Sequence, residues 1–475
     1  RPPTEPLTNI TNTKLLCCND SSTTGSTVTP DTISANGSPT ASTDSPFDDP
    51  AGFVFGDAGD QGVIKCGSYV GNGSTTGPEI FLGNGWEPQW VMIKSADTSN
   101  SWFILDSMRG IVSGGDDAEL YPNGSNAEVT QSNRISLTPT GFKINTTSSN
   151  FNTSGDTYIY TCIRRSDGYV GKPPELGSSV FTPVYDTANA PMFKTPNHDV
   201  DFTFQKDFNV VKDWNVAARL IQGKRLETNT AAAEEANQYQ MGDYSRGWSS
   251  YTGGDGSRIS YNFKRHAGFD CITYQGDGVA GKQIPHNLGS NNVPEMIWVK
   301  NRNDGNRSWI VYHKDLDSSA PQDKYLLLNH DNGAQDDTFW NDTAPTSTHF
   351  TVGSYSDVND STSGRSHLAL LFSSVNGISS VGSYNGSSGN VTVSCGFSPR
   401  FILIKRTNAA EDWLVFDTLR GINAGNDYRL RLNRDGAQVS SSDWIDLNSD
   451  GFIANNTGSA AIGGSGNTFI YYAHS

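Results

Sequence analysis

The sequence predicts an all-β protein made of tandem β-sandwich modules of jelly-roll or concanavalin-like type, each about 100 residues long, behind an extended N-terminal segment. Apolar residues make up only 35% of the chain, and 49 residues are glycine. The apolar residues form short runs separated by turns rich in Ser, Thr, Asn and Asp, which is typical of many short strands joined by tight turns. Only Asn229 to Tyr239 has clear helical propensity. A repeated sequence phrase is the third observation.

The chain contains several copies of one phrase. FILIKRTNAAEDWLVFDTLRGINAGNDYRLRLN at residues 401–433 parallels WVMIKSADTSNSWFILDSMRGIVSGGDDAELYPN at 90–123, and MIWVKNRNDGNRSWIVYHKDLDSSAPQDKYLLLN at 296–329 is a third copy. One position of the phrase is always tryptophan and is predicted to lie in the core of each module: Trp102, Trp214, Trp309 and Trp413. The spacing of roughly 95 to 112 residues suits an autonomous small domain better than a solenoid unit.

The first predicted element is the segment 1–51. Its KLLCCN stretch is a predicted strand, and the Ser/Thr/Pro/Gly-rich remainder has almost no aromatic residues. Such a composition cannot bury enough apolar surface to fold alone, so we expect an extended segment or linker.

The four modules follow in order. Module 1 spans 52–165 between the alternating strand GVIKCGSYVGNG and the closing strand TYIYTCIRR, and module 2 spans 166–265, is the most diverged, and closes with ISYNFKR. Module 3 spans 266–375 from HAGFDCITYQGDG to HLALLFSSV, and module 4 spans 376–475 from ISSVGSYNG to NTFIYYAHS. Because alternating strands have one apolar face to bury, packed antiparallel sheets are the expected architecture.

Charge and hydropathy exclude two classes of partner. The net charge is -16 and the pI is about 4.8, whereas nucleic-acid-binding proteins concentrate Lys and Arg on one face. No apolar stretch approaches the roughly 20 residues that a membrane helix requires. We therefore expect neither nucleic-acid binding nor membrane insertion.

Six cysteines are too few for a disulfide framework in a chain of 475 residues, and we predict free thiols from assembly in a reducing cytoplasm. Cys66 and Cys271 open equivalent strands, so both are predicted to be small buried core residues.

A second group of tryptophans lies in polar, turn-rich surroundings. An indole exposed in such a turn could stack on a sugar ring, while burial under a loop is the alternative. The candidate glycan-binding residues are Trp86, Trp248, Trp340 and Trp444.

The motifs LDSMRGI and FDTLRGI repeat an Asp three residues before an Arg-Gly pair. A functional interpretation has Arg109 and Arg420 binding an anionic sugar beside Asp106 and Asp417. We favour a structural role, in which the Asp caps a turn, the Arg pairs with it and the Gly permits a positive φ.

The remaining acidic residues offer only weak candidates for chemistry. Asp116, Asp117 and Glu119 lie in a polar stretch with nothing nearby in sequence to raise their pKa, and Asp336 and Asp337 lie in another. We predict no enzymatic activity, no cofactor and no metal. The alternatives are glycoside cleavage by converging carboxylates and calcium held by loop oxygens in residues 56–62, 301–306 or 330–337.

Several phrases have a distinctive wording: IPHNLG, PEMIWVKNR, VGSYNGSSGNVTVSCGF, FILIKRTNAAEDWLVFDTLRGI and GNTFIYYA. Through these phrases the modules resemble, over nearly the whole chain, repeat modules of large virion proteins from tailed bacteriophages, notably marine and cyanobacterial ones. The resemblance implies a structural or tail-fibre protein located in the virion, and it transfers no catalytic residue.

These observations together predict a non-enzymatic virion appendage that attaches to a host-surface glycan or protein or forms a structural fibre. The expected partners are other virion proteins and further copies of the chain, in a homotrimer or another homo-oligomer, which would add multivalency. Two alternatives stay open: a capsid or tail decoration without a receptor, and a secreted adhesin or extracellular filament subunit.

Overall fold

The computed structural model describes residues 9–14, 16–17, 26–28, 32–34, 36–37, 63–165, 176–236, 239, 241, 246–250, 254–265, 268–288, 292–362, 365–422 and 425–475. Antiparallel strands form most of the regular structure, so the all-β prediction is confirmed. The described part of the predicted helical segment contains no helix. None of the helices in the described residues is long and apolar enough to span a bilayer.

The chain divides into two compact units, residues 1–62 with 169–173 and residues 63–168 with 174–475. In the first unit, β1 (Leu16–Cys17) and β2 (Ser26–Val28) form an antiparallel pair at the predicted KLLCCN strand. The second unit contains all the described residues of the four modules.

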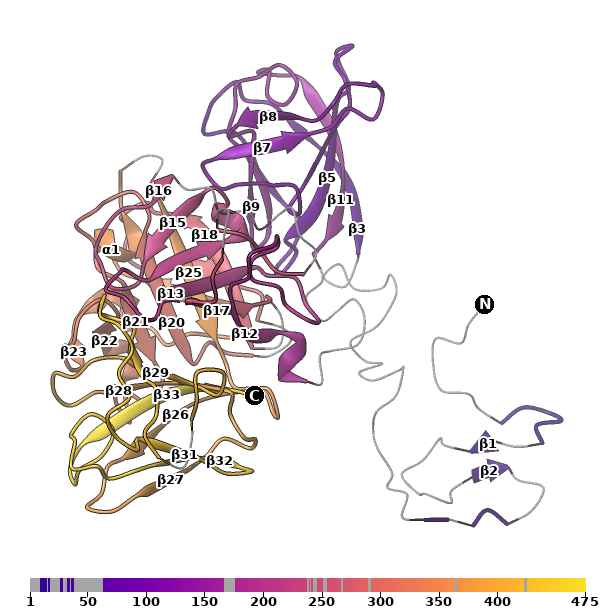
Figure 1. Cartoon of the computed structure of the whole chain (residues 1–475). Helices are drawn as coiled ribbons and strands as arrows, with labels where there is room; N and C mark the ends of the chain where they lie inside the picture. The colour runs from indigo at the N-terminus through magenta and orange to yellow at the C-terminus, as the bar shows by residue number, and fades with distance from the viewer. Residues whose placement is uncertain are drawn as a thin grey trace. The chain divides into compact units, whose positions relative to one another are not determined.

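Module 1 has a four-stranded main sheet of order β3-β11-β5-β6, a three-stranded sheet of order β4-β10-β9 and the pair β7-β8. Figure 1 shows β3, β11 and β5 of the main sheet beside the pair β7-β8. Its strands are β3 (Ile64–Val70), β4 (Glu79–Phe81), β5 (Pro88–Ser95), β6 (Phe103–Asp106), β7 (Asp116–Glu119), β8 (Val129–Ser132), β9 (Ile135–Thr138), β10 (Gly141–Ile144) and β11 (Thr157–Arg164).

Module 2 has one six-stranded sheet of order β12-β17-β13-β14-β15-β16. Its elements are the 3-10 helices η1 (Gly177–Ser179) and η2 (Arg219–Ile221) and the strands β12 (Phe181–Tyr185), β13 (Phe202–Asp207), β14 (Asn215–Ala218), β15 (Lys224–Glu227), β16 (Glu235–Ala236) and β17 (Arg258–Phe263).

Module 3 has a six-stranded sheet of order β18-β25-β20-β21-β22-β23 and the pair β19-β24. Its elements are β18 (Phe269–Gln275), β19 (Lys282–Pro285), β20 (Met296–Asn301), β21 (Ile310–His313), η3 (Pro321–Asp323), β22 (Lys324–Leu327), β23 (Gln335–Asp336), η4 (Thr338–Trp340), β24 (His349–Val352), α1 (Ser356–Asn359) and β25 (Ser366–Phe372).

Module 4 has a five-stranded sheet of order β26-β33-β28-β29-β30 and a three-stranded sheet of order β27-β32-β31. Its strands are β26 (Ser379–Asn385), β27 (Val391–Ser394), β28 (Phe401–Arg406), β29 (Leu414–Asp417), β30 (Leu430–Arg431), β31 (Ile445–Leu447), β32 (Gly451–Ala454) and β33 (Thr468–His474).

The main sheets of all four modules share one strand order. In each sheet the first strand of the module pairs with the last strand. The last strand also pairs with a strand that carries a lysine at an equivalent position in every module. The strand that follows the repeated tryptophan pairs with this lysine-bearing strand. The registers agree as well, because the repeated lysine of each module lies opposite an apolar residue of the closing strand. The pairs are Lys94 with Ile159, Lys206 with Ile259, Lys300 with Leu368 and Lys405 with Ile470. Equivalent positions can therefore be compared between modules.

The inner face of each main sheet packs on its own module. Module 1 encloses a core that includes Trp86, Ile93 and Phe142, and module 4 encloses one that includes Ile404, Trp444 and Phe452. Modules 2 and 3 have corresponding cores around Trp248 and Trp340.

The outer faces of three main sheets meet in a common central core. All of its buried residues come from modules 2, 3 and 4, and aromatic rings such as Phe204, Tyr261, Trp298, Phe401 and Tyr472 fill it. Because an apolar sheet face is stable only when another layer covers it, each of these three modules depends on the other two.

The repeated tryptophans close these three modules into a ring. Each indole donates from Nε1 to a backbone carbonyl of the next module: Trp214 to Arg431 O at 2.8 Å, Trp309 to Glu227 O at 2.7 Å and Trp413 to Leu327 O at 3.0 Å. Module 2 thus contacts module 4, module 4 contacts module 3, and module 3 contacts module 2. The arrangement is a pseudo-threefold ring within one chain.

The repeated lysines reinforce the same ring. Each Nζ donates to a carbonyl of the same neighbouring module: Lys206 to Asp435 O at 2.9 Å, Lys300 to Ala231 O at 2.9 Å and Lys405 to Asp331 O at 3.0 Å. Burial lowers the pKa of each of these ammonium groups to about 8.

We predict that the ring hydrogen bonds stabilise the fold. Trp309→Phe removes the donor to Glu227 O, whereas Trp298→Phe removes a similar volume from the same core without a hydrogen bond, because Trp298 Nε1 has no partner among the described residues. Trp309→Phe should lower the free energy of unfolding by about 1 kcal/mol more than Trp298→Phe. Urea denaturation measures the difference, and equal losses would contradict the role of the ring bond.

We also predict that His474 makes the central core sensitive to acid. Burial lowers its pKa to about 3, so between pH 6.5 and 3 the unfolded chain binds a proton that the folded chain does not. The contribution of neutral His474 to the free energy of unfolding is therefore fully present above pH 6.5. It decreases as the pH falls, by up to about 1.4 kcal/mol per pH unit. In His474→Phe, which copies the equivalent Phe263 and Phe372, the loss between pH 7 and 5 should be about 2 kcal/mol smaller by urea denaturation. The same loss in both proteins would exclude His474 as its source.

Candidate functional site

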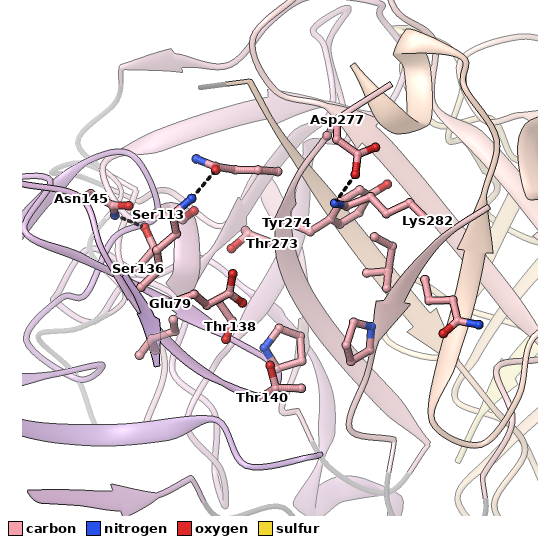
Figure 2. Close-up of a pocket in the computed structure, with 18 residues that line it drawn as sticks. Glu79, Ser113, Ser136, Thr138, Thr140, Asn145, Thr273, Tyr274, Asp277 and Lys282 are labelled. Carbon is pink, nitrogen blue, oxygen red and sulfur yellow. Dashed lines mark hydrogen bonds and ion pairs between the residues drawn. The ribbon is translucent and has the colours of Figure 1, made fainter. Parts of the chain in front are cut away.

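A cleft of about 470 Å³ lies where the small sheet of module 1 faces the edge of module 3 (Figure 2). Strands β4, β9 and β10 form one wall, and β18 and β19 with the turn between them form the other. Side chains on rigid strands therefore line both walls, and segments more than a hundred residues apart in sequence contribute to one site.

The cleft carries both signs of charge. Lys143 Nζ donates to Gln275 Oε1 at 2.8 Å across the cleft, and Lys282 Nζ donates to Asp277 Oδ2 at 2.8 Å along one wall. Slight burial raises the pKa of Asp277, but Lys282 and the backbone N–H of Val279 outweigh that effect and hold the pKa below its usual value. Glu79 is exposed on the opposite wall.

Uncharged groups complete the lining. The hydroxyl groups come from Ser136, Thr138, Thr140 and Thr273, and the apolar part comes from Leu137, Ile284 and Pro285. Thr138 Oγ1 is buried and has no hydrogen-bond partner among the described residues. A cleft that combines donors, acceptors and an apolar part of similar extent suits an amphipathic, uncharged or zwitterionic ligand such as a saccharide.

A buried charge network holds the two walls together. Glu87 of module 1 pairs with Arg265 of module 2 at 2.8 Å, and Arg165 of module 1 pairs with Asp270 of module 3 at 3.2 Å. Asp270 Oδ2 also accepts the backbone N–H of Asn287 at 2.8 Å, just beyond the cleft residue Pro285. These contacts fix the relative placement of β18, β19 and module 1.

Asp201 belongs to the same network. It pairs with Arg219 at 3.1 Å and accepts the backbone N–H of Arg265 at 2.8 Å. Burial raises the pKa of Asp201, but the two arginines together outweigh burial and hold the pKa at about 2. The carboxylate therefore stays ionised and serves as a structural counter-charge.

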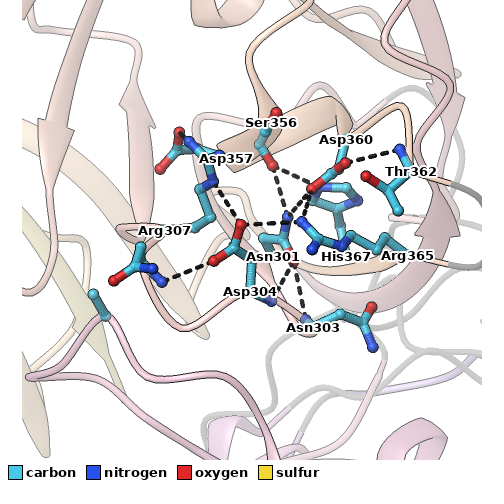
Figure 3. A network of polar contacts seen from close by, with 12 residues as sticks. Asn301, Asn303, Asp304, Arg307, Ser356, Asp357, Asp360, Thr362, Arg365 and His367 are labelled. Atoms are coloured by element: carbon cyan, nitrogen blue, oxygen red, sulfur yellow. Dashed lines mark hydrogen bonds and ion pairs between the residues drawn. The ribbon is translucent and has the colours of Figure 1, made fainter.

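A second polar cluster lies where β20, α1 and β25 meet (Figure 3). Asp360 accepts from Arg365 at 2.6 Å, from Asn301 at 3.1 Å and from the backbone N–H of Thr362 at 2.8 Å. Asp304 accepts from Arg365 at 3.0 Å. Burial raises the pKa of Asp360, but its three donors outweigh that effect and hold it far below the usual value. The cluster is a paired structural network that ties α1 to the main sheet.

The prediction that four tryptophans offer exposed rings for stacking on a glycan is wrong. Trp86, Trp248 and Trp340 are at most 1% exposed, and Trp444 is 4% exposed. Each belongs to the inner core of its module, because loops that are polar in sequence fold over the ring. Arg429 additionally stacks over Trp444 at 4.2 Å from the ring centroid.

The repeated Asp-Arg-Gly motif has the geometry of a structural turn. Asp106 Oδ1 and Asp417 Oδ1 each accept the backbone N–H of the arginine three residues later at 2.8 Å. The side chain of that arginine forms an ion pair with the same aspartate, at 2.6 Å for Arg109 and 2.5 Å for Arg420. The following glycines adopt φ values of 133° and 117°, in the region that L side chains avoid.

The four repeated tryptophans divide into two groups. Trp214, Trp309 and Trp413 are at most 1% exposed in the central core. Trp102 is only half-buried, so the prediction of a core position is wrong for module 1. The reason is that no neighbouring module in the described residues covers the outer face of the module 1 sheet.

The expectation that the acidic stretch of module 1 stays solvated is also wrong. Burial raises the pKa of Asp117 to about 7, although the backbone amides of Val112, Arg134 and Ile135 donate to its carboxylate. Asp427 accepts two equivalent backbone amides in module 4, so this carboxylate is a repeated structural clamp. Glu119 is buried beside it and pairs with Arg134 at 2.9 Å.

The other acidic candidates are also engaged within the protein. Asp336 pairs with Lys324 at 2.7 Å, Asp337 accepts the backbone N–H of Thr338, and Asp304 pairs with arginines. Over the described residues, no group of three or more His, Cys, Asp or Glu side chains is placed to hold a metal ion. The loop 56–62, the third candidate for calcium, lies outside the described residues.

Cys66, Cys162, Cys271 and Cys395 are free thiols. Burial raises the pKa of Cys162 and Cys271, whereas Cys66 is exposed, so its predicted core position is wrong. The neighbouring pair Cys17 and Cys18 is not covered, since Cys18 lies outside the described residues.

The fold defines a class of protein, an all-β chain in which repeated sandwich modules share a pseudo-threefold core. The family described as "Domain of unknown function (DUF7483)" matches residues 5–166 and 223–475, and the chain belongs to this family. The unmatched residues include the first half of module 2, which is also the most diverged part of the repeat. No curated protein matches the chain.

Sequence reasoning did not find the cleft. Glu79 and Lys143 lie in module 1, whereas Asp277 and Lys282 lie in module 3, and no binding or catalytic motif in the sequence includes them. The turn QGDG before Lys282 belongs to the predicted opening of module 3, and no local signal shows that it faces module 1.

We predict that the Asp-Arg pair of module 4 is required for stability. Asp417→Asn keeps the side-chain size but leaves the buried Arg420 without its counter-charge, and Tyr261 OH also donates to this carboxylate at 2.7 Å. The expected loss is about 3 to 5 kcal/mol in urea denaturation. The control Asp336→Asn breaks an exposed pair and should leave stability unchanged. A loss from Asp417→Asn no larger than that of the control would contradict the structural role.

Proposed function

We propose that this chain is a non-enzymatic virion appendage of a tailed bacteriophage, which binds a cell-surface saccharide of the host in the cleft between modules 1 and 3. The observation that carries the proposal is the lining of the cleft, which combines hydroxyl groups, an apolar part and both signs of charge. The resemblance of the repeated phrases to phage virion modules supports the location in the virion.

The charge arrangement favours binding over bond cleavage. Glycoside cleavage requires two carboxyl groups on either side of the scissile bond, one of them with a raised pKa. In the cleft, Asp277 pairs with Lys282, and its pKa is held below the usual value rather than raised. Asp117, whose pKa burial raises to about 7, is buried away from solvent and accepts three backbone N–H bonds, and it does not line the cleft.

A decoration protein that contributes only to assembly is the second candidate. The buried charge network and the shared central core supply a rigid body whether or not the cleft binds a ligand. In that case the cleft would be an unused junction between modules.

Binding of the full chain to a panel of bacterial surface polysaccharides and to whole bacterial cells tests the proposal. Saturable binding is expected, and Thr138→Arg, which places a guanidinium group in the cleft, should weaken it at least about tenfold, or 1.4 kcal/mol. Thr130→Arg on the exposed side of β8 is the matched control and should bind like the wild type.

The outcomes separate the candidates. Binding that Thr138→Arg does not change would place the ligand elsewhere, and a panel without any ligand would favour the decoration protein. Polysaccharide that is shortened after incubation with the chain would contradict a non-enzymatic role.

A further inference from the structure

We infer that three copies of this chain assemble through the outer face of the module 1 main sheet, in the arrangement that modules 2, 3 and 4 adopt within one chain. The inference concerns assembly and does not depend on what the cleft binds. It rests on equivalent positions that are buried in the ring and open in module 1.

The outer face of the module 1 sheet is apolar and exposed. Ile64 is 61% exposed and Ile159 is 40% exposed. In the ring, the positions equivalent to Ile64 include Phe181 and Phe269, which are 0% and 3% exposed. The positions equivalent to Ile159 are also at most 2% exposed and are occupied by Ile259, Leu368 and Ile470.

The rest of this face repeats the pattern. Four further apolar residues of this face are half-buried, namely Trp90, Met92, Ile104 and Ile163. Their counterparts in the ring are buried. A contiguous apolar sheet face of this kind on a soluble protein marks an interaction surface.

Trp102 has the same local setting as the ring tryptophans, but none of the described residues of another module contributes an acceptor for its indole. Its backbone N–H donates to Asn123 Oδ1 at 3.0 Å, and the ring tryptophans donate in the same way to Asn229, Asn329 and Asn433. In the ring, the indole acceptor is the carbonyl two residues before this asparagine in the neighbouring module. The equivalent carbonyl in module 1 is Tyr121 O.

Lys94 also lacks the contact that its equivalents make. Over the part of the chain that the structure describes, it donates to the carbonyls of Ser95 and Thr98 in its own module, at 2.5 and 2.7 Å. Each ring lysine reaches a carbonyl two residues after the repeated asparagine of the neighbour, and the equivalent carbonyl in module 1 is that of the exposed Ser125.

The Asp-Arg pair shows the effect of a missing neighbour directly. Arg420 and Asp417 are 1% and 0% exposed, and Tyr261 of the adjacent module donates to Asp417. Arg109 and Asp106 have the same geometry but are 24% and 19% exposed.

The occupant that fits this face is a second copy of module 1. One module carries both halves of the contact, the donors Trp102 and Lys94 and the acceptor segment from Tyr121 to Ser125. Such a head-to-tail contact closes into a ring when its rotation fits a whole number of copies, and within the chain the same contact closes at three modules.

The mass of the full chain in solution tests the inference, measured by light scattering and sedimentation over a range of concentrations. The wild type should have three times the 51.3 kDa of one chain. Ile159→Lys places an ammonium group opposite Lys94 in every copy and should reduce the mass to that of one chain. Val211→Lys, at a position 68% exposed in module 2, is the matched control and should remain trimeric.

Two further measurements keep the test decisive. Ile64→Asp is a second variant on the same face, and an unchanged circular dichroism spectrum shows that each variant is folded. Alkylation of Cys66, which lies on this face, should be slow in the wild type and fast in Ile159→Lys. A wild-type monomer at every concentration, a dimer, or a trimer that both variants leave intact would overturn the inference.

Discussion

The shared central core of modules 2, 3 and 4 is the constraint on which the rest of the second unit depends. Each main sheet has two apolar faces, and the small sheet or loops of its own module cover only one of them. The other face is covered because three sheets meet and because Trp214, Trp309 and Trp413 satisfy carbonyls of their neighbours. Directional hydrogen bonds thus fix the order of modules that apolar packing alone would leave undefined.

Module 1 is attached by a different kind of interaction. Its contacts with modules 2 and 3 include buried ion pairs of Glu87 and Arg165, rather than the outer face of its main sheet. Buried pairs of this kind contribute little net stability, but they disfavour every arrangement that leaves a charge unpaired. They therefore position the walls of the cleft and leave the apolar face of module 1 accessible.

Equivalent residues of the repeat have the same local geometry but differ in burial, depending on whether a neighbouring module covers them. Trp102 and Trp309 make the same backbone contact with an asparagine, yet only Trp309 is covered by a neighbour. The same holds for the Asp-Arg pairs, whose local geometry is equal while their exposure differs. Local sequence determines the geometry within a module, and the neighbour determines what that geometry stabilises.

The sequence by itself determined the strands, the repeat and the Asp-Arg-Gly turn, because alternation, spacing and turn chemistry act over a few residues. Only the tertiary structure decided the rest. Four tryptophans have polar neighbours in the sequence but lie in module cores: Trp86, Trp248, Trp340 and Trp444. Their burial comes from residues that are distant in the sequence, which a local pattern cannot show. Glu79 and Lys282 line one cleft for the same reason: the contact between modules 1 and 3 is set by packing and buried charges, which no local pattern encodes.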